Sequence, residues 1–219
     1  SSVNFDPKGY ANVFAAVNGG NMILLCVKNG SLARERVRDR YFPSRSWSDF
    51  DAALTRTPPA NEGRFMLPFF VAEITPNTSG ESLVRYRGGL REESGDACVR
   101  AVLEGQILNL ERELKRFVPM PHGLRCTGGA SANASFMQIV ADIFNAEVIR
   151  DETFNVGLVT DSVSLGSAMS AAHMLGYPFS ELVRIFRKSS TSVKPRSAEA
   201  YVDMKWRFAE ELDREIGSN

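Results

Sequence analysis

The sequence contains few of the features that mark secreted, membrane or nucleic-acid-binding proteins. Its 219 residues include only three cysteines, an odd number that forms no disulfide framework, and its first ten residues lack a signal-peptide pattern. The longest apolar runs, Met22–Val27 and Phe65–Val71, are far shorter than the roughly 20 residues that span a bilayer. Lysine plus arginine and aspartate plus glutamate both number 26, so no net charge attracts nucleic acid or a membrane. We expect a cytoplasmic protein with neither partner.

Recognisable metal and phosphate signatures are also missing. The possible metal ligands are Cys26, Cys98, Cys126, His122 and His173. No two of them have the short spacing of a zinc site, which predicts no metal centre and three buried structural thiols. The histidines have no evident partner and the carboxylates form no compelling acid–base pair, so no catalytic residue is assigned. Neither a Walker sequence nor G-x-G-x-x-G is present.

What is present is a globular composition, with 43% hydrophobic and 24% charged residues. Strand-like apolar runs alternate with helix-like segments, which predicts α/β architecture with a mixed sheet flanked by helices. No repeat or linker divides the chain, so residues 1–219 are interpreted as one domain. The expected strands are Met22–Val27, Phe65–Val71, Leu124–Thr127 and Glu147–Arg150. The expected helices begin at Ser31, Ser46, Asp96, Ser131 or Asn133, and Ser162, and a last one buries Tyr201, Met204, Phe208 and Leu212.

Local sequence patterns predict the burial, the helix caps and the sheet position of several elements. The uninterrupted Met22–Val27 run predicts a strand buried on both faces. Ser31 and Ser46 are placed to cap the helices that follow them. Pro68 lacks an N–H group, which places it at a sheet edge or a bulge. The polar stretch Ser189–Ser197 is assigned to neither strand nor helix.

The helix that begins near Asp96 has the clearest amphipathic pattern. Leu103 and Ile107 fall on a face that should enter the core, whereas Glu104 and Glu111 fall elsewhere. The pattern predicts that the acidic side chains face solvent.

One segment, Thr127–Asn133, has the composition of a ligand-binding turn. Gly128 and Gly129 lie between an expected strand and an expected helix. Glycine allows a ligand to approach the backbone, and a helix N-terminus attracts phosphate. A plain strand-to-helix turn explains the same glycines, and periodicity alone favours that interpretation by roughly three to one. Trp47 is similarly ambiguous, because an indole in a first helical turn either enters the core or flanks a flat ligand.

The chain resembles the C-terminal half of the FGGY carbohydrate kinases, and within them the eukaryotic D-xylulose kinase branch. Seven blocks carry the resemblance in family order over nearly the whole chain. They are Leu24–Leu32, Ser44–Phe50, Glu73–Pro76, Arg100–Gln106, Thr127–Asn133, Val140–Phe144 and Gly166–Ala168.

The resemblance implies a ribonuclease H-like, actin-like ATPase fold and a sugar kinase that uses ATP with Mg²⁺ on D-xylulose. By position, Gly128, Gly129 and Asn133 match the adenine-nucleotide segment, and Trp47 matches an aromatic residue at the rim of that pocket. Gly30 and Ser31 match another wall of the pocket and are secondary candidates, after these four residues. This reverses the preference for a plain turn at the two glycines.

The resemblance also implies what this chain lacks. The family's N-terminal domain, which carries a phosphate loop, most sugar contacts and the catalytic base, has no counterpart here. We therefore expect the isolated chain to be inactive. It should expose apolar surface near Met22–Val27 and Gly166–Ala172 that an N-terminal kinase domain or self-association would cover. The alternative is a non-catalytic module that binds nucleotide or pairs with a partner chain.

Overall fold

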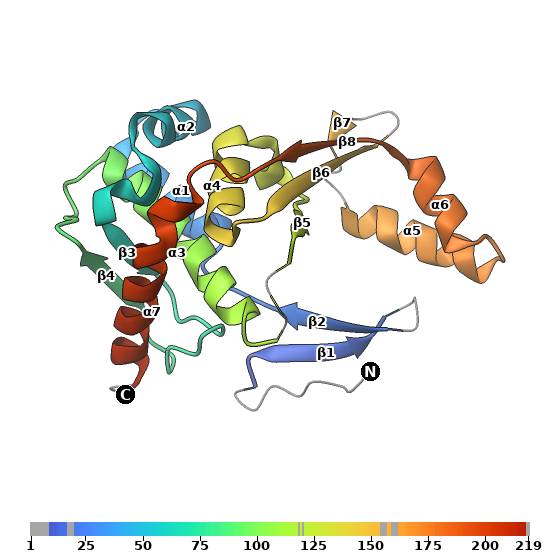
Figure 1. Cartoon of the computed structure of the whole chain (residues 1–219), viewed down its shortest axis with the longest axis horizontal. Helices are drawn as coiled ribbons and strands as arrows, with labels where there is room; N and C mark the ends of the chain where they lie inside the picture. Colours follow the sequence, from blue (N-terminus) through green and yellow to red (C-terminus); the bar gives the residue numbers. More distant parts are fainter. Residues whose placement is uncertain are drawn as a thin grey trace. The chain divides into compact units, whose positions relative to one another are not determined.

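The computed structural model describes residues 9–16, 20–117, 119, 121–153, 157–158 and 162–217 (Figure 1). The chain divides into two compact units, the first comprising Ser1–Met120 with Glu199–Asn219 and the second Pro121–Ala198. The sequence shows no such boundary, because neither a linker nor a change in composition marks Pro121. That residues 1–219 act as one domain stays a prediction.

The core of the first unit is built around helix α3 (Asp96–Leu114). All side chains from Ala97 to Asn109 are buried, so the helix is enclosed on every side. Glu104 and Glu111 are only 0% and 3% exposed, and the solvent-facing position predicted for them is wrong. Polar partners make their burial tolerable, as expected for buried carboxylates. These partners are Arg100 and Tyr201 at Glu104, and Lys115 and Lys205 at Glu111.

A two-stranded antiparallel sheet packs against α3. Its strands are β3 (Phe65–Phe69), which is fully buried, and β4 (Leu83–Arg87). Pro68 lies in β3 on a pair with no third strand among the described residues, which agrees with the predicted edge position. Gly105 of α3 approaches so closely that an added Cβ would lie 2.4 Å from the Met66 carbonyl oxygen. The close packing of helix on strand therefore requires a glycine there.

Helices α1 (Ser31–Tyr41) and α2 (Trp47–Arg56) also belong to the first unit, and a short 3-10 turn, Pro59–Gly63, follows them. Ser46 caps α2 as predicted, because its hydroxyl oxygen accepts hydrogen bonds from the N–H groups of Ser48 and Asp49. Ser31 does not cap α1. It is already the first helical residue, and the cap position belongs to Gly30, which has no side chain to bond the free N–H groups.

The remaining strands of the first unit form a hairpin of β1 (Ala11–Ala15) and β2 (Asn21–Leu25). Met22 is 49% and Leu24 is 40% exposed, so a strand buried on both faces is the wrong prediction. The reason is tertiary, since no described element covers these side chains. The expected exposure of apolar surface at this strand is confirmed.

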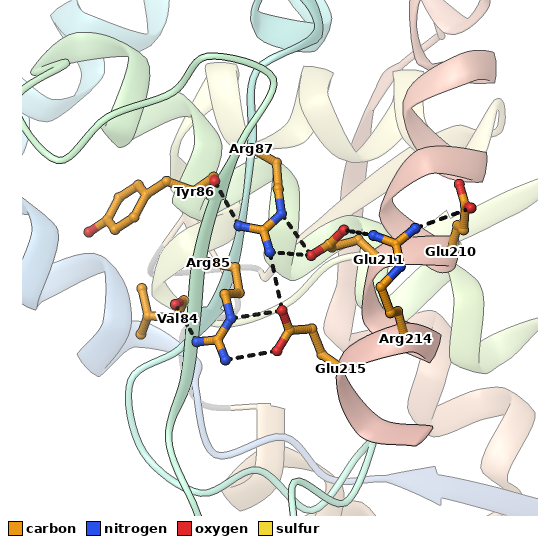
Figure 2. A network of polar contacts seen from close by, with 8 residues as sticks. All are labelled: Val84, Arg85, Tyr86, Arg87, Glu210, Glu211, Arg214 and Glu215. Atoms are coloured by element: carbon orange, nitrogen blue, oxygen red, sulfur yellow. Dashed lines mark hydrogen bonds and ion pairs between the residues drawn. The ribbon is translucent and has the colours of Figure 1, made fainter. Parts of the chain in front are cut away.

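Helix α7 (Val202–Gly217) completes the first unit by packing on α3 and β3. Its predicted inward residues, together with the residue before it, are buried: Tyr201, Met204, Phe208 and Leu212. Figure 2 shows a second link, in which arginines of β4 reach carboxylates of α7. Arg85 pairs with Glu215 at 2.8 Å, and the Arg87 Nε atom donates to Glu211 at 2.7 Å.

The second unit contains a four-stranded mixed sheet. β5 (Gly123–Arg125) is parallel to β6 (Glu147–Thr153), and β7 (Gly157–Leu158) and β8 (Arg187–Val193) are antiparallel to β6. Most of the polar stretch Ser189–Ser197 is therefore a strand. Backbone pairing with β6 satisfies its hydrogen bonds without an apolar pattern, which is why the sequence shows no strand there.

Three helices accompany this sheet. α4 (Ala134–Phe144) begins after Asn133, one of the two starts that the sequence predicts. Asn145, which follows its last residue, adopts left-handed geometry. α5 (Ser162–Met174) is the helix expected to begin at Ser162, and α6 (Phe179–Phe186) follows it. Gly166, Ala168 and Ala171 are exposed, as predicted for the surface at Gly166–Ala172. Val163 and Met174, outside that range, are 79% and 85% exposed.

Candidate functional site

The glycine turn predicted as a nucleotide site connects β5 to α4 in the second unit. Gly128 has a φ of 81°, a left-handed conformation that favours glycine. Gly129 begins a single 3-10 turn, Gly129–Ala132. Asn133 then caps α4, because its side-chain oxygen accepts a hydrogen bond from the Phe136 N–H group at 2.9 Å. Strand, glycine turn and helix follow one another as the sequence predicts.

The outer side of this turn is open. A Cβ built at Gly128 or Gly129 would meet no atom of the described residues within 4 Å. Backbone geometry explains the glycine only at Gly128, because Gly129 does not have a positive φ. Neither packing nor backbone conformation therefore explains why residue 129 is a glycine. Close approach of a ligand to the main chain would explain it.

The inner side of the turn is held by hydrogen bonds. Ser131 is buried, and its hydroxyl donates to the Gly128 carbonyl oxygen at 2.7 Å. Arg150 of β6 donates to the Ser131 carbonyl oxygen at 3.2 Å. The Cys126 N–H group donates to the Ile149 carbonyl oxygen at 2.9 Å, which extends the pairing of β5 with β6 up to the turn. The open backbone is thus presented by an anchored segment.

Trp47 lies in the first unit, as the first residue of α2. It is 42% exposed, although Phe50 behind it is buried and contacts its ring edge-on at 5.4 Å. The guanidinium group of Arg38 lies 4.4 Å from the centre of the indole. Trp47 is therefore a partly open aromatic surface. Since Trp47 and the Gly128–Asn133 turn belong to different units, its place in the same pocket stays a prediction.

A second ordered loop, Lys28–Gly30, precedes α1. The buried carboxylate of Glu73 accepts hydrogen bonds from the N–H groups of Lys28 at 2.8 Å and Asn29 at 2.9 Å. The Asn29 side chain donates to the same carboxylate at 2.9 Å and exchanges two hydrogen bonds with the backbone of Val71. Glu73 therefore fixes the path of the chain into α1.

Gln106 of α3 holds the other end of this loop. Its side-chain amide donates to the carbonyl oxygens of Asn29 at 2.6 Å and Gly30 at 2.8 Å, and it accepts a hydrogen bond from Arg34 at 2.9 Å. Sequence reasoning missed Glu73 and Gln106 as supports of this loop. Both lie in blocks that carry the family resemblance, which was the one available signal.

The histidines and cysteines form no centre in the described part of the chain. His122 and His173 are exposed, and His173 contacts the Phe179 ring and the Tyr177 carbonyl oxygen. Cys98 is buried, but Cys26 is exposed, so the prediction of three buried thiols is wrong. Cys26 directly follows the exposed hairpin strand β2, which explains its accessibility. Among described residues no three potential ligands are grouped to hold a metal ion, and no helix is long and apolar enough to span a membrane.

Residues 7–175 match the family model for the FGGY family of carbohydrate kinases, C-terminal domain. The chain belongs to the FGGY carbohydrate kinase family. It is 37% identical over 201 residues to the xylulose kinase of Rattus norvegicus. The aligned region covers 86% of this chain and 36% of that relative. The chain thus spans about a third of the length of the curated relatives that it matches.

Solved structures show the same fold. A ligand-bound xylulose kinase from Lactobacillus acidophilus superposes with a TM-score of 0.76 at 20% identity, covering 99% of this chain and 44% of that one. A gluconate kinase from the same organism superposes with a TM-score of 0.78 at 20% identity. The superposition covers 98% of this chain and 44% of the gluconate kinase. The likeness confirms the predicted α/β, actin-like ATPase fold. It does not select a sugar, because the two enzymes are named for different substrates.

Proposed function

We propose that this chain is the nucleotide-side domain of a D-xylulose kinase, which converts D-xylulose and ATP to D-xylulose 5-phosphate and ADP. Family membership and 37% identity to a xylulose kinase support the assignment. ATP, used with Mg²⁺, would supply the phosphoryl group. Phosphoryl transfer is catalysed mainly by positioning and charge stabilisation, so a domain that orients the nucleotide contributes without a catalytic base. The setting proposed for this reaction is the cytoplasm.

The adenine and ribose lie, in this proposal, against Gly128 and Gly129. The observation that carries the proposal is the open space beside Gly129. Nothing in the described structure requires a glycine at this position. Asn133 adds a polar side chain at the start of α4, and Trp47 forms a rim for the flat base. The base would fit this site by shape, because a backbone without a side chain leaves room for a planar group. A residue larger than glycine at this position would obstruct it.

The loop at Gly30 and Ser31 is proposed as another wall of the nucleotide pocket. A Cβ at Gly30 would meet no described atom within 4 Å, and α1 begins there without a side-chain cap. Free N–H groups at a helix N-terminus favour anionic ligands. Glu73 and Gln106 would keep this wall in place, since moving it breaks buried hydrogen bonds to both residues.

We also propose that the isolated chain is inactive and pairs with an N-terminal kinase domain or with itself. Exposed apolar residues on the hairpin support pairing, namely Phe14 at 46%, Met22 at 49% and Leu24 at 40% exposed. Patches of this kind tend to recruit partners. Sedimentation across a wide concentration range tests this. A strictly monomeric chain without affinity for an added N-terminal domain contradicts the pairing.

The substrate assignment is tested in a full-length kinase that carries this chain as its C-terminal domain. D-Xylulose should give the highest kcat/KM in a panel that includes gluconate and glycerol, with ADP release as the assay. A preference for another sugar overturns the assignment. The same assay on the chain alone should give no sugar-dependent ADP release, and appreciable turnover refutes the proposed inactivity.

A further inference from the structure

We propose that a pocket between α1 and the β3–β4 hairpin binds a small, flat organic anion. The pocket has a volume of about 320 Å³, within the range of small-molecule sites. The residues that would contact such a ligand are Arg36, Tyr41, Met66, Phe70, Val84 and Tyr86. All belong to the first unit, and none lies in the proposed nucleotide site. Binding in this pocket is therefore independent of the xylulose kinase assignment.

The alternation of side chains along β4 creates one wall of this pocket. Arg85 and Arg87 point toward α7, where they bind Glu215 and Glu211. Figure 2 shows Val84 and Tyr86 on the opposite side of the strand from α7. Since successive strand residues face opposite sides, the ion pairs with α7 direct an apolar side chain and an aromatic one into the pocket.

The neighbouring strand and α1 supply the rest of the enclosure. Met66 is the cross-strand partner of Tyr86 and is only 1% exposed, so it forms a buried apolar floor. Phe70 follows the end of β3, and Tyr41 lies in the last turn of α1. Together with Tyr86 these residues line the space with three aromatic rings. Rings in such an arrangement favour a planar apolar ligand that stacks or packs edge-on.

The charge of the pocket selects an anion. Arg40 pairs with Glu92 at 2.5 Å, so these two charges offset each other. The Arg36 side chain makes no ion pair or hydrogen bond with the described residues, and its guanidinium carbon lies 5.2 Å from the centre of the Phe70 ring. One guanidinium group is therefore available beside an aromatic wall. Guanidinium groups bind carboxylates through two parallel hydrogen bonds, which favours a carboxylate on a flat body.

Tyr86 offers a second polar contact. Its hydroxyl has no hydrogen-bond partner among the described residues. Burial, with a smaller effect of Glu92, raises the pKa of Tyr86, so the phenol remains protonated and able to donate at neutral pH. A carboxylate between Arg36 and Tyr86 would receive donors from both, while its ring contacts Met66 and Val84.

The test uses the full chain and 2-naphthoate as the probe, with binding followed by amide chemical shifts and calorimetry. We expect saturable binding, with shift changes concentrated at residues 36–41, 66–70 and 84–86. Naphthalene-2-carboxamide, which has the same shape without charge, should bind about tenfold more weakly. Inorganic phosphate should not compete. Absence of saturable binding, equal affinity for the amide, or equally tight binding of phosphate overturns the proposal.

Two variants assign the contacts. Arg36→Gln should weaken 2-naphthoate binding about tenfold, and Tyr86→Phe should weaken it by a smaller factor. Arg184→Gln, at an exposed position of α6, makes the same chemical change in the other unit and should leave the affinity unchanged. An unaltered affinity in Arg36→Gln refutes the assignment. If that variant fails to fold, the comparison of acid with amide on the unaltered chain still decides the role of charge.

Discussion

Replacement of Glu104 by glutamine perturbs the buried centre of α3. The side chain is 0% exposed. One carboxylate oxygen, Oε1, accepts hydrogen bonds from the Tyr201 hydroxyl at 2.6 Å, Arg100 at 2.9 Å and the Ala60 N–H group at 3.2 Å. The other oxygen, Oε2, has no partner among the described residues. Burial raises the pKa of Glu104 to about 7, against the opposing effects of Arg100 and Tyr201.

The sign and size of the effect follow from this shift. The pKa is raised above the ordinary 4.5, so the folded state binds the proton more tightly than the unfolded state. The Glu104 contribution to stability therefore falls as pH rises from the ordinary pKa to the raised one, by about 3 kcal/mol at about 1.36 kcal/mol per pH unit. Glutamine has the shape of the protonated acid and does not titrate. Glu104→Gln should match the wild type near pH 5 and exceed its stability by up to about 3 kcal/mol near pH 8.

The assay is urea unfolding of both proteins at several pH values in this range. Tyr201→Phe is the companion variant, because it removes a hydrogen bond to the ionised acid. The pKa of Glu104 should then rise further, and the loss of stability should extend to higher pH. A difference between wild type and Glu104→Gln that is constant from pH 5 to pH 8, or that changes in the opposite direction, refutes the reasoning.

Three further predictions concern stability. Ser46→Ala removes the cap of α2 and should cost about 1 kcal/mol in urea unfolding, whereas an unchanged midpoint contradicts the capping role. Gly105→Ala places a Cβ against the Met66 carbonyl oxygen and should cost about 1–3 kcal/mol, while Gly166→Ala, whose Cβ meets no described atom, should stabilise α5 by about 0.5–1 kcal/mol. Equal effects of the two glycine variants would argue against the close packing of α3 on β3. Burial opposes the shift, but Arg87 and Arg214 lower the pKa of Glu211. The contribution of Glu211 to stability is therefore present above its ordinary pKa and is lost as pH falls through its lowered pKa. Arg87→Ala should reduce this loss in melting temperatures measured from pH 5 to pH 3, and an unchanged acid profile excludes the pairing as its cause.

Signals within a few residues predicted local structure well. Asn133 caps α4 because its side chain binds a backbone N–H group in the adjacent turn, and the same holds for Ser46 at α2. The prediction that Ser31 caps α1 was wrong for a related reason. A serine at a helix start caps only when its own backbone is outside the helix, and the sequence does not reveal which of Gly30 and Ser31 has that conformation.

Contacts distant in sequence were not predictable in the same way. Glu104 resembles a solvent-facing residue until Tyr201 and Arg100 are placed beside it, and β8 lacks an apolar pattern because its support comes from pairing with β6. In the candidate site, the turn at Gly128 and Gly129 is visible in the sequence. The carboxylate of Glu73 beneath the loop before α1 is visible only after folding.

In the proposed nucleotide site, ATP lies against the open backbone of Gly129. The most direct test measures ATP affinity of Gly129→Val in a full-length kinase that carries this chain. Because a Cβ built at Gly129 meets no described atom within 4 Å and Gly129 has no positive φ, we expect the melting temperature to stay unchanged. The affinity should fall at least about tenfold, while Gly217→Val, an equally open position at the end of α7, should have no effect. Unchanged ATP affinity in Gly129→Val would contradict the proposed site.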